Sequence, residues 1–546
     1  MSILAALTCA LLAASVLYFV KLARVLFATS GQPGFITLLL PLSNLNALLF
    51  PAHWRFNIQR QSVWGSKADI YRKFNSTVLV IPSLFPPAVT VFVGEGPAMN
   101  LVNKDRNTFV KPREANPPVL SLYGPNLLSS EGADWRHHRK VAAPSFSEKN
   151  TAQVWETTMR LVAEWQEKVD KEQGKDGKTV VDKSEDVWAV LTLLVMGKAG
   201  FGIDFPWPST ISLKQEDERV NFYQASKIVL RDWRPMSTFP GLVFKLPSSK
   251  LQRIQRGYDI FGDELRRIVQ ERVEEVKKGG NRDDLLTALV KANLKEEGKD
   301  KLTNAELLSD AYIFLIAGHE TSANTLSVVF LLLALYPSHQ DALHDEAVSV
   351  FGSRPIAESS YSETYHALPI TLATIQEGLR LAGPVAAVVK QAVVDTWLPA
   401  RTVPKEGEKS EETKVFVPAG SLLRENITGI QYGAEAWPDP YDFNPKRFLE
   451  KDWNRDSFYP FSSGLRGCIG RPFAMAELVA VVSAMLLKYR IEVPEHRKDE
   501  WQLKEGETER ERRERIMNPA WSLTLGPQGI DLAFAQRLKK EVHGGA

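Results

Sequence analysis

The feature that most constrains the fold is a glycine-rich segment around Cys468, near the carboxyl end of the chain. It reads Phe461-Ser-Ser-Gly464-Leu-Arg466-Gly-Cys468-Ile-Gly470. Its glycines allow backbone conformations that branched residues cannot take, and they let the backbone approach a flat group closely. Backbone N–H groups in such a loop can point at the sulfur and favour a thiolate. Residues 471–477 read as the start of a helix, whose dipole also favours an anion.

Composition excludes several other classes of protein. The only cysteines are Cys9 and Cys468, so neither a disulfide-stapled secreted fold nor a zinc module built on several cysteines is possible. The formal net charge is +2, which gives no electrostatic basis for binding nucleic acid. The chain is therefore expected to be an ordinary globular protein without a nucleic-acid partner.

The amino-terminal segment has the character of a membrane anchor. Residues 2–20 carry no charge, and Lys21 and Arg24 follow them. A helix of that length spans about 28 Å, close to the hydrocarbon thickness of a bilayer. The basic residues on the carboxyl side predict a single crossing with the body of the protein in the cytosol. A cleaved signal peptide is the alternative, but no basic segment precedes the apolar run.

A second apolar stretch, Phe35–Phe50, is interrupted by Pro41, Asn44 and Asn46. These interruptions favour a monotopic or re-entrant helix over a second crossing. The expected organisation is an anchor at 1–25, a membrane-associated segment and linker at 26–55, and a single catalytic domain at 56–546.

The remainder of the chain predicts a mainly helical body with small sheets. The clearest helix runs from Thr303 to about Tyr336, where Pro337 ends it, and its apolar residues recur at spacings of three and four. Its expected length of about 50 Å is enough to cross a domain. Short strands are predicted at 77–81, 89–93, 414–417 and 522–525.

The segment around Cys468 resembles the haem-binding loop of the cytochrome P-450 superfamily, Phe-x-x-Gly-x-Arg-x-Cys-x-Gly. The resemblance implies an α+β cytochrome P-450 fold behind a transmembrane helix. It also implies haem b, with Cys468 as the axial thiolate ligand of the iron. Phe461, Gly464, Arg466 and Gly470 are the other residues that the resemblance places at the cofactor.

A second matching segment lies in the long helix and reads Ala317-Gly318-His319-Glu320-Thr321-Ser322. In the family, small residues such as Ala317 and Gly318 form a groove for dioxygen beside the haem. The resemblance assigns Thr321 as the hydroxyl and Glu320 as the acid that deliver protons to oxygen. Alternatively, Thr321 only bonds back to a helix carbonyl. A zinc-protease interpretation fails because Ala323 stands where its second histidine is required.

Two further pairs match the family. Trp135 and Arg139, four residues apart, resemble the Trp-x-x-x-Arg helix that contacts a haem propionate. Their neighbours Arg136 and Lys140 are candidates for contact with an acidic redox partner.

Glu377 and Arg380 match the Glu-x-x-Arg pair, and Arg447 matches the third member of a buried triad that braces the haem loop. We expect all three to be structural. One departure from the family is Lys390, which stands where many members carry a propionate-binding arginine.

The resemblance implies a monooxygenase that inserts one oxygen atom from O2 into a lipophilic substrate by hydroxylation or epoxidation. Electrons are expected from NADPH through a separate cytochrome P-450 reductase, with cytochrome b5 as an additional candidate, at the endoplasmic reticulum membrane. Fungal members that tailor terpenoids, sterols or other secondary metabolites, or that oxidise xenobiotics, are the nearest analogy. Two alternatives remain open: a haem-thiolate isomerase or dehydratase that rearranges a peroxide without a reductase, and a non-catalytic membrane haem protein.

Overall fold

The structure is a computed structural model, and it describes most of the 546 residues. The described residues are 3–41, 64–112, 117–205, 207, 222–238, 243–244, 246–298, 301–403, 409–521 and 523–537. Its contacts divide the chain into two compact units. Unit 1 comprises residues 1–115, 385–441 and 454–468, and unit 2 comprises residues 116–384, 442–453 and 469–546.

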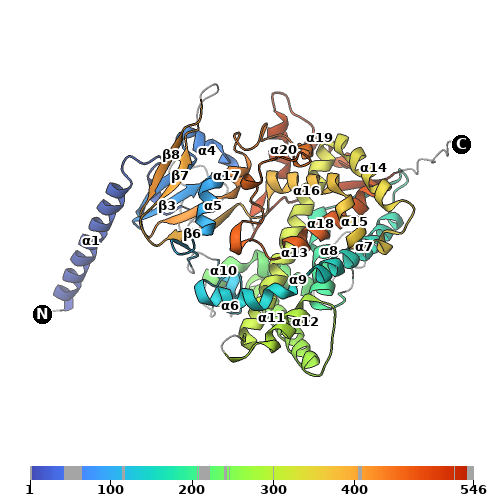
Figure 1. The fold of residues 1–546 in the computed structure, drawn as a ribbon, viewed down its shortest axis with the longest axis horizontal. Helices are drawn as coiled ribbons and strands as arrows, with labels where there is room; N and C mark the ends of the chain where they lie inside the picture. The colour runs from blue at the N-terminus through green and yellow to red at the C-terminus, as the bar shows by residue number, and fades with distance from the viewer. Residues whose placement is uncertain are drawn as a thin grey trace. The chain divides into compact units, whose positions relative to one another are not determined.

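Unit 1 combines the amino-terminal part of the chain with two later segments, which appear in Figure 1 as blue and orange ribbons in one sheet. Its helices and turns are α1 (Ile3–Ala28), α4 (Asp69–Lys73), α5 (Gly96–Lys104), α17 (Ile427–Gln431), η11 (Arg455–Ser457) and η12 (Gly464–Arg466). Its strands are β1 (Thr37–Leu39), β2 (Val78–Phe85), β3 (Ala88–Val93), β4 (Phe109–Val110), β6 (Ala387–Ala392), β7 (Thr396–Arg401), β8 (Glu412–Val417) and β9 (Leu422–Asn426).

Six of these strands form a mixed sheet in the order β1-β2-β3-β9-β6-β4. β3 and β9 are parallel neighbours although more than 300 residues separate them, with Val91 opposite Leu423. β7 and β8 form a separate antiparallel pair. Valines dominate the buried face of the sheet, and α5 packs on it through Ala98, Met99 and Val102. β-branched residues suit such a pleated, buried surface.

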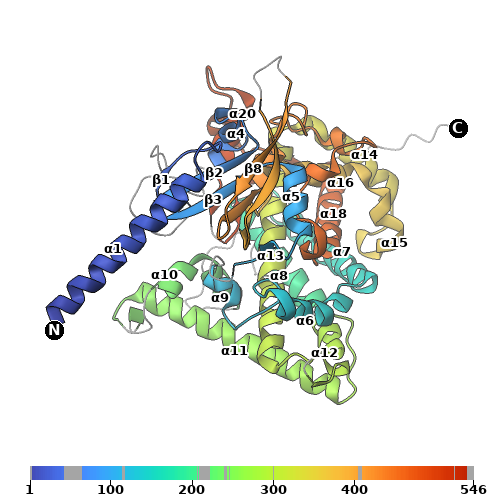
Figure 2. The same cartoon turned by 60° about the vertical axis from the view of Figure 1, so that its left-hand side comes forward.

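Helix α1 extends away from this sheet at its amino-terminal end (Figure 2). The segment Leu7–Ala28 has the length and mean hydropathy, 1.9, of a helix that crosses a membrane. Its carboxyl-terminal part contacts the sheet, where the Tyr18 hydroxyl donates a hydrogen bond to the Leu84 carbonyl at 2.8 Å. Val25, further along the helix, packs against the core of the sheet.

Unit 2 is mainly helical. Its longer helices are α6 (Gly132–Ala142), α7 (Glu148–Lys171), α8 (Ser184–Val195), α9 (Phe222–Arg231), α11 (Ser249–Lys277), α12 (Leu285–Lys295), α13 (Asn304–Leu335), α14 (Gln340–Phe351), α16 (Pro369–Ala382), α18 (Arg471–Lys488) and α20 (Glu509–Met517). Shorter helices and turns are η2 (Pro118–Ser121), η3 (Ala143–Ser145), the π-helical turn η4 (Met196–Gly200), α10 (Trp233–Thr238), η7 (Pro337–His339), η8 (Ile356–Glu358), α15 (Tyr361–Thr364), η9 (Tyr365–Ala367), η10 (Pro445–Phe448), η13 (Glu495–Arg497) and α19 (Lys498–Trp501). Its strands are β5 (Lys178–Val181), β10 (Tyr489–Glu492), β11 (Ala520–Trp521), β12 (Leu525–Gly526) and β13 (Leu532–Gln536), with a three-stranded sheet in the order β10-β13-β5.

The long helix α13 is the central element of unit 2 and packs against α8, α16 and α18. It begins at Asn304 behind a capping box, in which Thr303 and Glu306 satisfy each other's backbone N–H groups. It ends at Leu335, before the proline at 337 that cannot continue it. The predicted helix from Thr303 to about Tyr336 is therefore confirmed, as is the mainly α fold class with small sheets.

Two sequence-based expectations were wrong in their local structure. Residues 37–39 form strand β1, parallel to β2, rather than part of a re-entrant helix, because Thr37 and Leu39 are buried against the sheet. Residues 42–63, which include the rest of that apolar stretch, lie outside the described residues. Of the strand predicted at 522–525, residues 523–524 connect β11 with β12 and Leu525 lies in β12, which pairs antiparallel with β11 through Trp521 and Leu525, while residue 522 lies outside the described residues. The other three predicted strands match β2, β3 and β8.

Candidate functional site

The loop that carries Cys468 is closed by its own backbone. The Cys468 N–H donates to the Phe461 carbonyl at 2.9 Å, and the Gly467 N–H donates to the Gly464 carbonyl at 3.0 Å. These two amides therefore close the loop. Phe461 and Arg466 are half-buried, whereas Cys468 is exposed. As the sequence predicts, a helix begins shortly afterwards: α18 starts at Arg471 with Gly470 as its N-cap.

Of the glycines in this loop, Gly464 is the one whose conformation requires glycine. It has a φ of +66°, and an added Cβ would lie 3.2 Å from the Asn103 carbonyl oxygen. Gly467 and Gly470 have negative φ angles of −53° and −84°. Ser462, which no pattern in the sequence distinguishes, also has a positive φ, of 57°. The tight part of the loop thus lies before the cysteine.

The triad that the resemblance implies is assembled and buried within unit 2. Arg380 Nε and Nη2 donate to the two Glu377 carboxylate oxygens at 2.7 and 2.8 Å, and Arg447 Nε donates to Oε1 at 3.3 Å. The side chains of Glu377 and Arg380 are fully buried. Arg380 also donates to the Asp442 carbonyl at 3.1 Å, and Glu377 accepts from the Asn444 N–H at 2.9 Å. The carboxylate therefore fixes the segment around Asp442 and Asn444 to α16, which is a structural role.

Beyond Leu308, helix α13 has one open stretch in an otherwise buried surface. Ala317 is exposed, and Gly318, Thr321 and Asn324 are half-buried, while most of their neighbours in the helix are buried. An added Cβ on Gly318 would meet the terminal methyl group of Met196, which would have to shift. Ala317, Thr321 and Asn324 leave one narrow face of the helix free of bulky side chains.

Thr321 and Glu320 occupy different surroundings. Thr321 Oγ1 donates to the Ala317 carbonyl at 2.8 Å, which is the back-bonding geometry that the sequence left as the alternative. Glu320 is 9% exposed, and its Oε1 accepts from the Thr524 N–H at 3.4 Å. Thr321 therefore faces the open stretch of α13, whereas Glu320 is directed toward the connection between β11 and β12.

Glu320 also lines a small cleft within unit 2. The cleft has a volume of about 80 Å³, and its walls are formed by α8, α9 and α13 together with Ala520, Thr524 and residues 526–528. Its other polar lining residues include Glu185, Asp186, Tyr223, Lys227, Arg231 and Asn324. Lys227 and Arg231 both pair with Asp186. Charged side chains that surround a small space are compatible with ordered water, so Glu320 has polar surroundings on one side.

His319, which precedes Glu320, is part of the core. It is 4% exposed, and its Nδ1 lies 2.8 Å from the Leu315 carbonyl. Burial lowers its pKa to about 4, so the imidazole is neutral at pH 7 and donates from Nδ1. This agrees with the sequence-based exclusion of a zinc-protease site.

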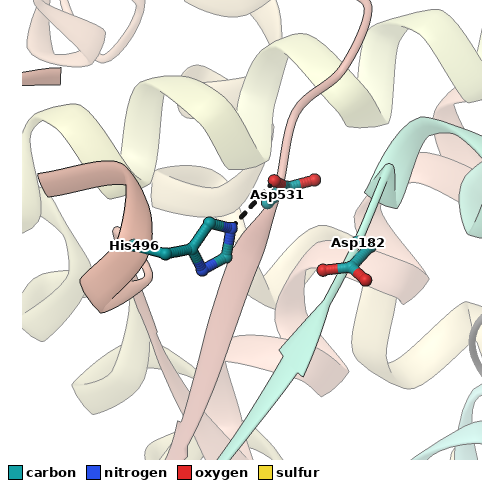
Figure 3. A group of neighbouring side chains, drawn as sticks. All are labelled: Asp182, His496 and Asp531. Carbon is teal, nitrogen blue, oxygen red and sulfur yellow. Dashed lines mark hydrogen bonds and ion pairs between the residues drawn. The ribbon is translucent and has the colours of Figure 1, made fainter. Parts of the chain in front are cut away.

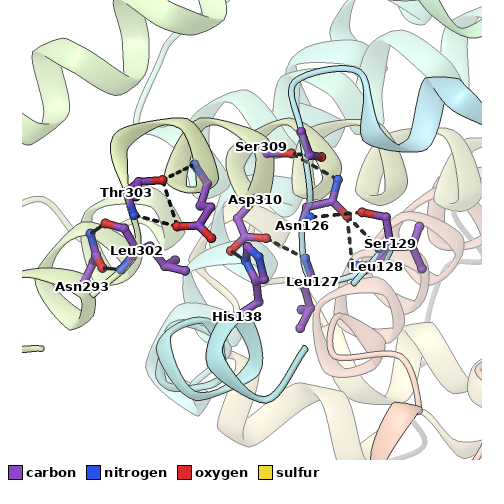
Figure 4. A network of polar contacts seen from close by, with 12 residues as sticks. Asn126, Leu127, Leu128, Ser129, His138, Asn293, Leu302, Thr303, Ser309 and Asp310 are labelled. Carbon is purple, nitrogen blue, oxygen red and sulfur yellow. Dashed lines mark hydrogen bonds and ion pairs between the residues drawn. The ribbon is translucent and has the colours of Figure 1, made fainter. Parts of the chain in front are cut away.

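Helix α6 carries Trp135 and Arg139 on one face, as their spacing predicts. Trp135 is buried and Arg139 half-buried. The adjacent His138 is buried and its Nδ1 lies 2.8 Å from Asp310 Oδ2 of α13 (Figure 4). Burial raises the pKa of Asp310, and the hydrogen bond from His138 opposes that rise. This buried contact, which sequence reasoning missed, ties α6 to α13.

The chain segment before α6 is attached to the same part of α13 (Figure 4). The Leu127 N–H donates to Asp310 Oδ1 at 2.8 Å, and Ser309 Oγ donates to the Gly124 carbonyl at 2.7 Å. Tyr312 OH donates to the Val119 carbonyl at 2.6 Å. Residues 119–127 are therefore held along about one turn of the helix, from Ser309 to Tyr312.

One group of side chains elsewhere has the composition of a metal site. Asp182, His496 and Asp531 lie close together in unit 2 (Figure 3). Asp531 Oδ2 accepts from Arg497 Nε at 2.7 Å, and Oδ1 accepts from the Lys183 N–H at 2.9 Å. A guanidinium in contact with the central carboxylate opposes a second cation there. The ion pairs of Asp531 with Arg497 and His496 account for this cluster without a metal ion.

The chemistry of several residues, each taken within its own unit, fits a haem group. In unit 1, the exposed Cys468 follows a turn with a positive φ at Gly464. In unit 2, α13 leaves a face without bulky side chains at Ala317 and Thr321. A soft thiolate is a ligand that haem iron accepts. Trp135 and Arg139 offer hydrogen-bond donors of the kind that carboxylate groups bind.

Comparison with known proteins agrees with this fit. The family described as cytochrome P450 matches residues 50–508. Cytochrome P450 monooxygenase 124 of Postia placenta is 33% identical over 487 residues, which cover 87% of this chain and 89% of the relative. Cyclooctat-9-en-7-ol 5-monooxygenase of Streptomyces melanosporofaciens is 30% identical over 380 residues, with 68% and 73% covered.

The fold has a match among solved structures as well. The crystal structure of the cytochrome P450DA heme domain superposes with a TM-score of 0.68 at 19% identity, covering 92% of this chain and 98% of that one. Family members carry haem whose iron is bound by a cysteine thiolate. With its loop, its long helix and these relatives, the chain belongs to the cytochrome P450 family and is a haem-thiolate monooxygenase.

Proposed function

We propose that this monooxygenase is membrane-anchored, oxidises a lipophilic small molecule, and uses Cys468 as the axial ligand of its haem. The observation that carries the assignment of the ligand is the closed loop of residues 461–468, which ends on an exposed sulfur. Cys9, the other cysteine, lies in the apolar helix α1. Haem held by a thiolate supplies the reductive cleavage of O2, so that one oxygen atom enters a C–H or C=C bond and the other leaves as water.

In this proposal, the loop and α6 hold the haem. Phe461, Gly464 and Gly470 shape the backbone around the sulfur. Arg466 of the loop, with Trp135 and Arg139 of α6, bind the haem carboxylates, because guanidinium and indole N–H groups donate to carboxylate oxygens. Ala317 and Gly318 of α13 keep space beside the haem for dioxygen.

Glu320 and Thr321 are proposed to move protons. The Thr321 hydroxyl already donates to the Ala317 carbonyl, so its oxygen lone pairs can accept a hydrogen bond from water or from a bound oxygen species. Glu320 lies next to it in sequence and lines the polar cleft, which gives its carboxyl group a route for exchanging protons with water. The two residues thus connect a proton source with the open face of α13.

Electrons are proposed to come from NADPH through a separate membrane-bound reductase, with cytochrome b5 as an additional candidate. Arg136 is exposed on α6 and suits an acidic partner. Lys140 is already paired with Glu296 at 2.7 Å, so the basic surface available to a partner is smaller than the sequence indicates.

The proposed substrate is lipophilic because the chain offers apolar surfaces and a membrane helix. Residues 384–389 read Pro-Val-Ala-Ala-Val-Val and carry no polar side chain. Cyclooctat-9-en-7-ol, after which one relative is named, is an unsaturated alcohol and therefore has the expected chemistry. We place the protein at the endoplasmic reticulum membrane with the catalytic region in the cytosol, and we propose tailoring of a terpenoid, sterol or other secondary metabolite, or oxidation of a xenobiotic.

The test is product mass. The chain is co-expressed with a membrane-bound cytochrome P450 reductase and supplied with terpenoids, sterols and aromatic compounds. Products one oxygen atom heavier, formed only with the reductase, are expected. Conversion of a hydroperoxide without reductase or NADPH would instead support an isomerase or dehydratase. A haem-loaded protein with no turnover in either assay would support a non-catalytic haem protein.

A further inference from the structure

One face of helix α5, in unit 1, supports the chain that leads into the Cys468 loop. Gly96, Asn100 and Asn103 lie on this face, at positions i, i+4 and i+7. The segment 456–464 contacts all three, as the distances below show. Ala98, Met99 and Val102 of the same helix are fully buried in the core of the sheet. The helix is therefore fixed to the sheet and presents a second, partly polar face to the segment.

The contacts follow the helix from its first turn to its last. A Cβ on Gly96 would lie 2.7 Å from the Asp456 carbonyl oxygen, so the two backbones touch there. Tyr459 OH donates to Asn100 Oδ1 at 2.8 Å. At the other end, a Cβ on Gly464 would lie 3.2 Å from the Asn103 carbonyl oxygen and 3.6 Å from the Asn103 Cβ. The segment thus ends with Gly464 resting on Asn103.

Asn103 is itself held by a carboxylate from a distant part of the chain. Its Nδ2 donates to the Met99 carbonyl at 3.0 Å and to Glu425 Oε1 of β9 at 2.6 Å. Asn103 is 3% exposed and Glu425 is 2% exposed. Both amide protons of Asn103 are therefore used, one along its own helix and one across to the sheet.

Lys390 of β6 completes the cluster. The register pairs Lys390 with Leu423 and Val388 with Glu425, so Lys390 and Glu425 lie diagonally on one face of the sheet. Lys390 is 4% exposed. Burial raises the pKa of Glu425 to about 7, and the positive charge of Lys390 and the hydrogen bond from Asn103 lower it. The carboxyl group has few polar neighbours, so losing Asn103 would leave it poorly satisfied.

We propose that Asn103 and Glu425 are positioning residues for the Cys468 loop. By fixing the last turn of α5, they fix the surface on which Gly464 rests, and four residues later the chain reaches the sulfur. The inference rests on the proposed function only in taking Cys468 as the ligand. Neither residue needs to touch the haem, so the effect of substituting either should appear in thiolate ligation rather than in substrate binding.

The experiment compares two buried asparagines. Asn103→Leu removes the contact with Glu425, whereas Asn293→Leu removes a similar pair of buried hydrogen bonds, to Leu302 in unit 2. Each haem-loaded variant is measured for its thermal midpoint, its haem reduction potential, and the thiolate-type share of the ferrous carbon monoxide spectrum. We expect both to lose stability. Only Asn103→Leu should lose a several-fold share of the thiolate form and shift the potential.

A charge swap tests the same contact with smaller changes. Glu425→Gln keeps an oxygen that accepts from Asn103, so its spectrum should match the wild type. Asn103→Asp places two carboxyl groups opposite each other and should lower the thiolate share. The double variant with both substitutions restores one donor and one acceptor with reversed roles, and its spectrum should return toward the wild type.

Two results would overturn the proposal: equal thiolate shares in Asn103→Leu and Asn293→Leu, or a thiolate share in the double variant no higher than in Asn103→Asp. If Asn103→Leu does not fold, the charge swap decides. Failure of the proposed ligand is a separate result, because Cys468→Ser would then keep the thiolate spectrum in an otherwise unchanged protein. That result would also remove the basis of this inference.

Discussion

The hydroxyl of Thr321 donates its proton to the carbonyl of Ala317, one helical turn earlier, at 2.8 Å. The Thr325 hydroxyl makes the same bond to the Thr321 carbonyl, also at 2.8 Å. The two threonines differ in exposure, because Thr321 is half-buried on the open stretch of α13 and Thr325 is 2% exposed. The structure therefore provides a matched pair in which only one hydroxyl is accessible.

This pair gives a test of proton delivery. Thr321→Ala should lower the product formed per NADPH by about tenfold or more, since general acid catalysis typically contributes roughly 10²–10⁴ in rate. NADPH consumption should continue, with hydrogen peroxide as the main product. Thr325→Ala removes the same back-bond and should leave the ratio unchanged. Equal ratios in the two variants would show that Thr321 has only a structural role.

The second prediction concerns the ligand itself. Cys468→Ser should abolish the thiolate-type carbon monoxide spectrum, because a serine hydroxyl is not a soft anionic donor at neutral pH. Cys9→Ser, in helix α1, should leave the spectrum intact. Absorption spectra of the two purified variants at equal haem content decide the matter, and a wild-type band in the Cys468→Ser variant refutes the assignment.

The buried triad should dominate the stability of unit 2. Arg380→Ala leaves the fully buried Glu377 carboxylate without its main partner, and we expect a loss of about 3–5 kcal/mol in the free energy of unfolding. Arg267→Ala, which breaks a solvent-exposed pair with Glu264 in α11, should cost about 0–1 kcal/mol. Denaturant titration of both variants tests the contrast, and similar losses would contradict it.

Stability should fall with acid because of His319. Its folded pKa of about 4 lies below the ordinary value of 6.5, so between these values the unfolded chain binds a proton that the folded protein excludes. The stability from this residue is complete above pH 6.5 and is lost as the pH falls toward 4. The difference amounts to roughly 3 kcal/mol at 1.36 kcal/mol per pKa unit.

His319→Gln should flatten this part of the pH profile, since glutamine can donate to the Leu315 carbonyl but does not titrate. The thermal midpoint of both proteins is measured between pH 4 and pH 7. Parallel profiles would show that His319 is not the source of the acid sensitivity.

The fifth prediction separates two contributions to the loss of folding stability when Gly464 is replaced by alanine. Gly464→Ala should cost roughly 1–2 kcal/mol for its left-handed backbone and a further amount of about 1–3 kcal/mol for the contact of the new Cβ with Asn103. Gly420→Ala has the backbone cost alone, because φ is +83° and nothing lies within 4 Å of the new Cβ. Denaturant titration of both variants measures the difference. Equal losses in the free energy of unfolding would mean that the loop shifts to accommodate the new Cβ beside Asn103.

Local patterns predicted the long helix well. The capping box at Thr303, the apolar periodicity and Pro337 are all short-range signals, and α13 runs from Asn304 to Leu335 as they indicate. Local sequence patterns also predicted the helix after Cys468 and three of the four strands correctly. The connection at 523–524 was not predicted, because alternating small and apolar residues suit a strand and a tight connection alike.

The contacts that sequence reasoning missed join residues far apart in the chain. Asp310 meets His138 across 172 positions, and Glu425 meets Asn103 across 322. Neither pair has a fixed spacing, and each residue type is common on exposed surfaces. Met196 opposite Gly318 is a similar case, since only the packing shows which side chain an added Cβ on that glycine would meet.

The hydrogen bond between Tyr18 and Leu84 has a consequence for how the proposed membrane anchor would meet a bilayer. It ties α1 to the sheet well before the helix ends, so the stretch that extends beyond the sheet is Ile3–Leu17, about 22 Å long. A bilayer core of roughly 27–30 Å is thicker than that. Such hydrophobic mismatch favours local thinning of the membrane, or a resting depth at which Phe27 and Phe85, 87% and 52% exposed, enter the headgroup layer.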